Sequence, residues 1–267
     1  MSVNGYLERL SSRLVLTASE KASIETSLTT LSIRLNYFFN NGEMKRHFQF
    51  GSSTRGTILP RKVDSGSDID YMIIFKNPNG FKPETLLRYL KIFMHKYYST
   101  SDIYKDSPTM VLKLNHIKFE LTPALEDWMG NLSIPSTNPS KTFSEWIHTE
   151  PVSFNKKLTV ANVRSQSKLK PVIRLMKYWN KSILGGYYSS FKLEEWIVDR
   201  YAYSGKSSIK LYIYEIIEVL TPDYNSSQVF KRNLEKSKQV IANCKKYESM
   251  GQFTLAETEI KKLFSEF

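Results

Sequence analysis

The feature that most constrains the fold is a short apolar run with an acidic start. Residues 69–75 read Ile-Asp-Tyr-Met-Ile-Ile-Phe, and Asp68 precedes them. An apolar run of this length, rich in branched and aromatic side chains, predicts a buried strand. Residues two apart in a strand point to the same side, so Asp68 and Asp70 would present two carboxylates toward one point. Such anions repel each other unless a cation bridges them, and Mg²⁺, which accepts carboxylate and phosphate oxygens, is suited to that place.

A third carboxylate is expected from the alternation in residues 117–121. The apolar side chains share one face of a predicted strand, and Glu120 lies on the opposite, polar face. Beside the first strand, Glu120 would complete a catalytic, metal-binding set with Asp68 and Asp70. Three carboxylates can hold two metal ions about 4 Å apart, one to activate a sugar hydroxyl and one to neutralise the triphosphate that is cleaved. We therefore expect two Mg²⁺ ions, with Mn²⁺ as a substitute, and phosphoryl-transfer chemistry.

A glycine turn precedes the acidic strand. Residues 50–57 read Phe-Gly-Ser-Ser-Thr-Arg-Gly-Thr, and small residues there let backbone N–H groups approach phosphate oxygens. Gly51 and Ser52 are therefore predicted to bind substrate. Asp-x-Asp alone is usually a solvated turn, and Gly-Ser alone is a weak signal. Their conjunction with a basic turn and a later strand carboxylate is much rarer than either part.

Secondary structure is mixed in the first half of the chain. Residues 4–40 predict a short helix and then a long amphipathic one, with a capping box at 17–20. A helix is expected over 81–98, and two apolar alternating runs around Asn115-His116 predict a hairpin. The stretch 146–163 is expected to be extended.

Helical patterns dominate the second half. They cover about 168–183, 193–202, 207–220, 226–248 and 254–266. The sequence thus predicts an α+β protein in two parts. A mixed catalytic lobe with a long N-terminal helix would span residues 1–160, and a helical nucleotide-binding lobe would span residues 161–267.

Composition favours an anionic partner and a reducing compartment. The chain has 38 Lys and Arg against 26 Asp and Glu, a formal net charge of +12. This balance suits nucleotides, nucleic acid or a membrane surface. The single cysteine, Cys244, excludes an internal disulfide framework and a zinc ribbon. No run approaches the roughly 18 apolar residues of a membrane helix, and no signal peptide is recognisable. We expect a soluble, unprocessed cytoplasmic protein without a membrane partner.

The order of these motifs resembles the polymerase β superfamily of nucleotidyltransferases. Its pattern is an apolar residue, Gly-Ser, a spacer, Asp-x-Asp and a distant third carboxylate. In the second half, residues 175–179 (Leu-Met-Lys-Tyr-Trp) and 188–191 (Tyr-Ser-Ser-Phe) resemble the helical lobe of oligoadenylate synthases and cyclic GMP–AMP synthases. In that family a helix lysine and a later serine hold the donor triphosphate, and a following aromatic stacks on its base. The resemblance assigns these roles to Lys177, Ser190 and Phe191, and it implies an active-site cleft between the lobes.

Two departures from the family pattern concern the third carboxylate and zinc. Many relatives use aspartate where this chain has Glu120, and Glu126 or Asp127 is the alternative. The lone Cys244 rules out the zinc-binding insert of the animal DNA sensor, so DNA activation by that device is not implied.

The long N-terminal helical segment and Gly56-Thr57 resemble the bacterial antiviral-defence branch, which makes cyclic or linear oligonucleotide second messengers. The resemblance implies an enzyme of the CBASS type that joins nucleoside triphosphates, such as ATP or GTP, and releases pyrophosphate. It also implies a nucleic-acid or protein activator and a downstream messenger-activated effector. The alternatives are a nucleotidyltransferase that modifies an RNA end, a drug or a protein acceptor, and a catalytically silent antitoxin-type binding module.

Overall fold

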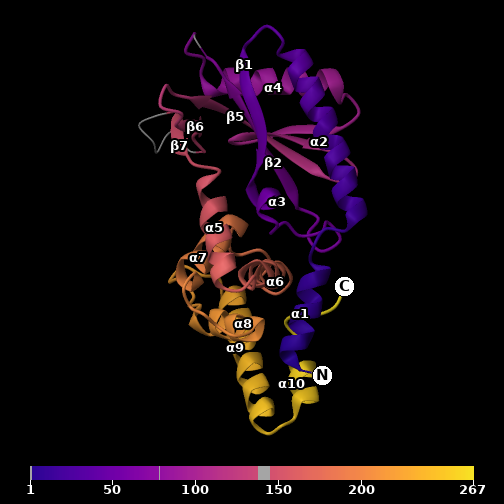
Figure 1. The fold of residues 1–267 in the computed structure, drawn as a ribbon, viewed down its shortest axis with the longest axis vertical. Helices are drawn as coiled ribbons and strands as arrows, with labels where there is room; N and C mark the ends of the chain where they lie inside the picture. The colour runs from indigo at the N-terminus through magenta and orange to yellow at the C-terminus, as the bar shows by residue number, and fades with distance from the viewer. Residues whose placement is uncertain (1, 78, 138–144) are drawn as a thin grey trace. The chain divides into compact units, whose positions relative to one another are not determined.

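Chain segments that are distant in sequence assemble into two units in the computed structural model, which describes residues 2–77, 79–137 and 145–267 (Figure 1). The sheet unit comprises Thr17–Arg55 and Gly66–Asn155, and the helical unit comprises Met1–Leu16, Gly56–Ser65 and Lys156–Phe267. The predicted α+β class is confirmed. The predicted division into domains 1–160 and 161–267 stays a prediction, and each unit is described by itself.

The sheet unit is built around a mixed sheet. In the described residues its strands are β1 (Met44–Phe50), β2 (Asp68–Phe75), β3 (Asp102–Asp106), β4 (Thr109–Lys113), β5 (Lys118–Glu126), β6 (Leu132–Pro135) and β7 (Trp146–Thr149). The strand order is β1-β2-β5-β4-β3, and β6 joins β5 to β7. The pair β2–β5 is parallel and the other pairs are antiparallel. The predicted strand over 69–75 and the predicted hairpin around Asn115-His116 are confirmed.

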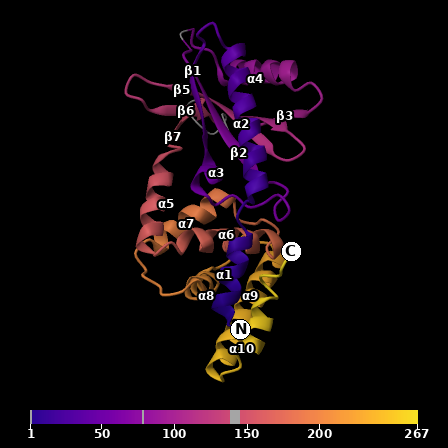
Figure 2. The ribbon, with the colours of Figure 1, turned by 45° about the vertical axis from the view of Figure 1, so that its right-hand side comes forward.

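Strand β2 is buried on both faces beyond its acidic start, as its apolar run predicts. On one face, Met72 and Ile74 pack in a cluster with Ala124 and Leu132 from β5 and β6. On the other side of the sheet layer, helix α4 (Pro83–Tyr97) packs on β3, β4 and β5, and α2 (Ala18–Phe38) packs on α4 (Figure 2). Asp70 precedes Met72 by two residues, so the acidic side chains share the face of that apolar cluster.

The predicted capping box fixes the start of α2. The Thr17 side chain accepts a hydrogen bond from the Glu20 backbone N–H at 3.2 Å. The Glu20 carboxylate accepts one from the Thr17 backbone N–H at 2.8 Å. Two backbone donors that the helix itself cannot satisfy are thereby paired.

The helical unit confirms the helices expected in the second half of the chain. It contains α1 (Val3–Arg13), α6 (Leu169–Ser182), α7 (Ser190–Tyr201), α8 (Ile209–Val219), α9 (Gln228–Ser249) and α10 (Phe253–Ile260), with most of α5 (Ser153–Arg164). Helix α1 packs against α6, α8 and α10 (Figure 2). The Tyr6 hydroxyl donates to the Phe264 carbonyl, and Arg13 pairs with Glu266 at 2.8 Å. The first helix of the chain thus contacts the last residues of the chain.

The extended conformation expected over 146–163 is wrong for most of that stretch. Only β7 is extended, and α5 begins at Ser153. Its β-branched residues Val160 and Val163 favoured a strand but are exposed, whereas Phe154, Leu158 and Ala161 are buried. Those buried positions are three or four residues apart, the spacing of one helix face, so packing outweighs local propensity. None of the helices in the described residues has the length and apolar character needed to cross a bilayer.

Candidate active site

The register between β2 and β5 collects four charged side chains on one face of the sheet. Asp68 is paired with Lys118, and Asp70 is paired with Glu120. Residues paired across parallel strands point to the same side, as do residues two apart along a strand. The three predicted carboxylates therefore share one face at the start of the two strands. Their catalytic and metal-binding roles stay predictions.

Lys118 joins two of these carboxylates. Its Nζ lies 3.1 Å from Asp68 Oδ2 and 2.8 Å from Glu120 Oε1. Burial opposes the charge on Lys118, but the hydrogen bond to Glu120 and the charge of Asp68 outweigh it, so the pKa of the amino group is raised. Burial and the charge of Asp68 also raise the pKa of Glu120. The carboxylates are therefore close enough to repel each other and to need a positive neighbour.

Gly51 lies directly against Asp70. Strand β1 pairs Phe50 with Asp70, and the chain then turns into the short helix α3 (Gly51–Arg55). Gly51 has a φ of +77°, and a Cβ built there would lie 1.7 Å from Asp70 Oδ2. Glycine is required at this position because of both its backbone conformation and its neighbour. Ser52 follows in the first turn of α3 and is half-buried. The substrate-binding roles of Gly51 and Ser52 stay predictions.

The donor chemistry of this face fits a divalent cation. Its three carboxylates supply hard oxygen ligands, and a cation, the Lys118 ammonium, already bridges Asp68 and Glu120. Within the described ranges, no three His, Cys, Asp or Glu side chains are gathered closely enough to hold a metal ion as they stand. Metal binding at Asp68, Asp70 and Glu120 would therefore require their side chains to adjust.

The two alternative third carboxylates lie at the far end of β5. Glu126 pairs with Lys45 at 2.5 Å and Arg46 at 2.7 Å. Asp127 accepts hydrogen bonds from backbone N–H groups within its own turn. Glu126 lies six positions along the strand from Glu120, which corresponds to about 20 Å. The geometry thus favours Glu120 as the partner of the β2 carboxylates.

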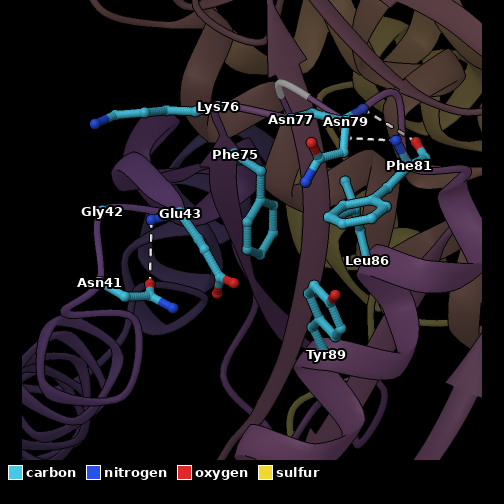
Figure 3. A pocket seen from close by; sticks show the side chains of 10 residues that line it. All are labelled: Asn41, Gly42, Glu43, Phe75, Lys76, Asn77, Asn79, Phe81, Leu86 and Tyr89. Atoms are coloured by element: carbon cyan, nitrogen blue, oxygen red, sulfur yellow. Dashed lines mark hydrogen bonds between the residues drawn. The ribbon is translucent and has the colours of Figure 1, made fainter.

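A small cavity of about 200 Å³ lies at the other end of β2. Figure 3 shows the Glu43 carboxylate and the rings of Phe75 and Tyr89 directed toward a common space. The Asn77 side chain closes one side by hydrogen bonds to the Phe81 backbone. Phe75 is the last residue of β2 and Asp68 is the first, so this cavity is separate from the carboxylate face.

In the helical unit, Lys177 lies in a buried polar cluster. Its Nζ donates to Glu194 Oε1 at 3.0 Å and to the Thr57 carbonyl at 3.0 Å. The Thr57 hydroxyl donates to the same carboxylate at 2.9 Å. Lys177 is 6% exposed, and Thr57 and Glu194 are fully buried. The ammonium is thus held in one place by α7 and by the segment that follows Arg55.

Ser190 and Phe191 begin α7, the helix that carries Glu194. The Ser189 hydroxyl caps α7 by accepting from the Lys192 backbone N–H. Ser190 is exposed, and Phe191 is 46% exposed, so its ring is accessible. The structure links Lys177 to this helix through Glu194. The proposed contacts of Lys177, Ser190 and Phe191 with nucleotide stay predictions.

Sequence reasoning missed two charged residues that organise these sites. Lys118 shares the polar face of its strand with Glu120, and that alternation was a visible signal. Glu194 follows Ser190 by four residues, one helical turn, and lies among the apolar residues of α7. An acidic residue on a buried helix face implies a buried partner. Which lysine pairs with it depends on the packing of α6 against α7.

Comparisons with known proteins agree with this fold. Residues 1–162 match the family model of the Second Messenger Oligonucleotide or Dinucleotide Synthetase domain. A comparison with curated proteins finds no match.

Among solved structures, Vibrio cholerae DncV with bound GTP is similar at a TM-score of 0.79 and 13% identity, over 99% of this chain and 95% of that chain. The Escherichia coli MS115-1 CdnC in complex with HORMA-deltaN is similar at a TM-score of 0.73 and 13% identity, over 98% of this chain and 97% of that chain. Bradyrhizobium diazoefficiens CdnG in complex with GTP is similar at a TM-score of 0.67 and 11% identity, over 97% of this chain and 98% of that chain. The family match covers more than half of the chain, and the protein therefore belongs to the second messenger oligonucleotide or dinucleotide synthetase family.

Proposed function

We propose that this protein is a Mg²⁺-dependent nucleotidyltransferase that joins nucleoside triphosphates into a cyclic or linear oligonucleotide second messenger and releases pyrophosphate. The observation that carries the proposal is the register of β2 and β5, which puts Asp70 beside Glu120 and next to the Gly51 turn. Family membership supports the same reaction.

Each predicted residue has a physical task in this reaction. Asp68, Asp70 and Glu120 would hold the metal ions. When bound, Mg²⁺ supplies activation of the attacking sugar hydroxyl and neutralises the triphosphate. The glycine at position 51 leaves room for a phosphate to approach the backbone, and Ser52 would donate to it.

The helical unit would hold the donor nucleotide. Lys177 is a point charge suited to phosphate oxygens, and the Ser190 hydroxyl can donate a hydrogen bond. The accessible Phe191 ring offers a stacking face for a base. Glu194 would act as a positioning residue because it fixes the Lys177 ammonium.

Relatives support the choice of substrates and partners. A mutant of Vibrio cholerae DncV has been solved with ATP and GTP, and Escherichia coli CdnC has been solved with ATP and with HORMA-deltaN. We therefore propose ATP, GTP or both as substrates and a protein or nucleic-acid activator. A messenger-activated effector in bacterial anti-phage signalling would be the downstream partner, and the cytosol would be the compartment.

The direct test is incubation of the purified protein with the four radiolabelled nucleoside triphosphates and MgCl₂. We expect pyrophosphate release and an oligonucleotide product that mass spectrometry identifies. If no product forms alone, with nucleic acid or with candidate activator proteins, messenger synthesis is wrong. A product that forms only with an RNA, drug or protein acceptor would instead support the modifying class. Nucleotide binding without turnover under all conditions would support a silent binding module.

Gly51→Ala should lower nucleotidyl transfer by at least about a hundredfold, because the new methyl group would push the Asp70 carboxylate out of place. The left-handed backbone should also destabilise the alanine variant by about 1–2 kcal/mol. Initial rates and thermal unfolding measure the two effects.

Gly130→Ala is the matched control for this prediction. Gly130 has a φ of +87°, and a methyl group added there would meet no atom within 4 Å. It should show similar backbone strain with normal activity. Equal rates for the two alanine variants would contradict the steric role of Gly51.

A further inference from the structure

A lysine amino group bridges two of the three predicted metal-binding carboxylates. Lys118 is the first residue of β5, and its Nζ contacts Asp68 at 3.1 Å and Glu120 at 2.8 Å. The three side chains are between 18% and 28% exposed. Partial removal from water strengthens both the attraction between unlike charges and the repulsion between like charges.

This position sets Lys118 in competition with a metal ion. A divalent cation and an ammonium are attracted to the same carboxylate oxygens, and they repel each other. Without either one, Asp68 and Glu120 would face each other as uncompensated anions, and such like-charged pairs are unfavourable. One cation can therefore replace the other on these two carboxylates.

We infer that Lys118 is an internal counter-ion that holds Asp68 and Glu120 together in the metal-free protein and is displaced from them when a divalent cation binds. Lys118 thereby lowers the affinity for metal and sets the free Mg²⁺ concentration at which the site fills. The inference rests on the proposed function, because it takes the carboxylates as metal ligands.

The lysine side chain is suited to such an exchange. Its four-carbon stem is flexible and its ammonium is a compact, strongly hydrated charge. The side chain begins at the end of a strand and is 18% exposed, so the amino group has a route to water.

The test measures metal binding without catalysis. Mn²⁺ binding is followed by electron paramagnetic resonance of the free ion, and thermal unfolding is recorded with and without Mn²⁺. The variants are Lys118→Met and Lys118→Arg, with Lys105→Met as the matched control. Lys105 lies on β3 of the same sheet and pairs with Glu84. Its replacement removes the same charge from a surface ion pair away from β2 and β5.

Lys118→Met should bind Mn²⁺ about tenfold more tightly than the unaltered protein. Without metal, this variant should unfold at a lower temperature than the unaltered protein. Saturating Mn²⁺ should raise its unfolding temperature by more than it raises that of the unaltered protein. Lys118→Arg keeps the positive charge, so its Mn²⁺ affinity should stay within about twofold of the unaltered protein. Lys105→Met should match the unaltered protein in affinity. A purely structural role for Lys118 would not tighten Mn²⁺ binding.

Asp70→Asn separates the two ways in which the inference can fail. If the unaltered protein binds Mn²⁺ and Asp70→Asn abolishes that binding, the metal site stands. Equal or weaker Mn²⁺ binding by Lys118→Met would then overturn the role of Lys118 alone. If no Mn²⁺ binding depends on Asp70, the predicted metal site and the inference are both wrong.

Discussion

Asp70→Asn should reduce oligonucleotide synthesis by at least about a thousandfold, equivalent to about 4 kcal/mol of transition-state stabilisation. Asparagine has nearly the shape of aspartate but lacks the negative charge that strengthens the binding of a divalent cation. Asp70 is paired with Glu120 in the register of β2 and β5 and lies against Gly51. Product formation at saturating nucleotide and MgCl₂ measures the loss, and circular dichroism with thermal unfolding checks the fold.

Asp102→Asn is the control for this substitution. Asp102 lies on β3 of the same sheet, is largely exposed and pairs only loosely with Lys113, at 3.4 Å. It undergoes the same chemical change away from the carboxylate face and should keep normal activity. If Asp70→Asn keeps a rate within about tenfold of the Asp102→Asn control, Asp70 is not a metal-binding carboxylate of this reaction.

Glu194→Ala should lower the free energy of unfolding by about 3–5 kcal/mol. The substitution leaves the buried Lys177 ammonium without its carboxylate and removes the acceptor of the Thr57 hydroxyl. Urea unfolding followed by fluorescence measures the change. Glu235→Ala in α9 is the control, since Glu235 is 69% exposed and lies 3.6 Å from Lys238. An exposed pair of this kind contributes at most about 1 kcal/mol.

A double variant separates the structural and catalytic parts of this cluster. Lys177→Met combined with Glu194→Leu replaces the buried ion pair by apolar groups, and such replacements are often neutral for stability. We expect the double variant to lose less free energy of unfolding than Glu194→Ala, because it leaves no unpaired charge buried, although the Thr57 hydroxyl still loses its acceptor. If Lys177 holds the triphosphate, the double variant should still show a raised KM for nucleotide. A stable double variant with an unchanged KM would contradict that role.

Local patterns predicted most of the elements, but not the pairings that make the site. The capping box at Thr17 and the apolar run of β2 depend on neighbours in sequence, and both were predicted. The parallel register of Asp70 with Glu120 depends on β5 entering the sheet beside β2, which no local pattern specifies. The four-residue strand β6 is too short for alternation to be recognised, whereas β7 lies within the stretch predicted to be extended, which ends earlier than predicted.

The same distinction applies to single side chains. Gly51 was predicted as a phosphate-binding residue from its small size, but its close approach to Asp70 depends on how β1 pairs with β2. Lys118 was visible on the polar face of β5, but its two ion pairs follow from the register. Lys177 was singled out by resemblance, and its burial against Glu194 depends on helix packing.

The packing of α1 against α6, α8 and α10 has a consequence for synthesis on the ribosome. Helix α1 ends at Arg13 and α10 begins at Phe253, so about 240 residues separate them. At about 5–20 residues per second, the chain between them takes roughly ten to fifty seconds to make. During that time Leu7 and Leu10, which are buried in the finished protein, have no complete surface to pack against. The apolar face of α1 therefore cannot be fully covered until α10 has been made.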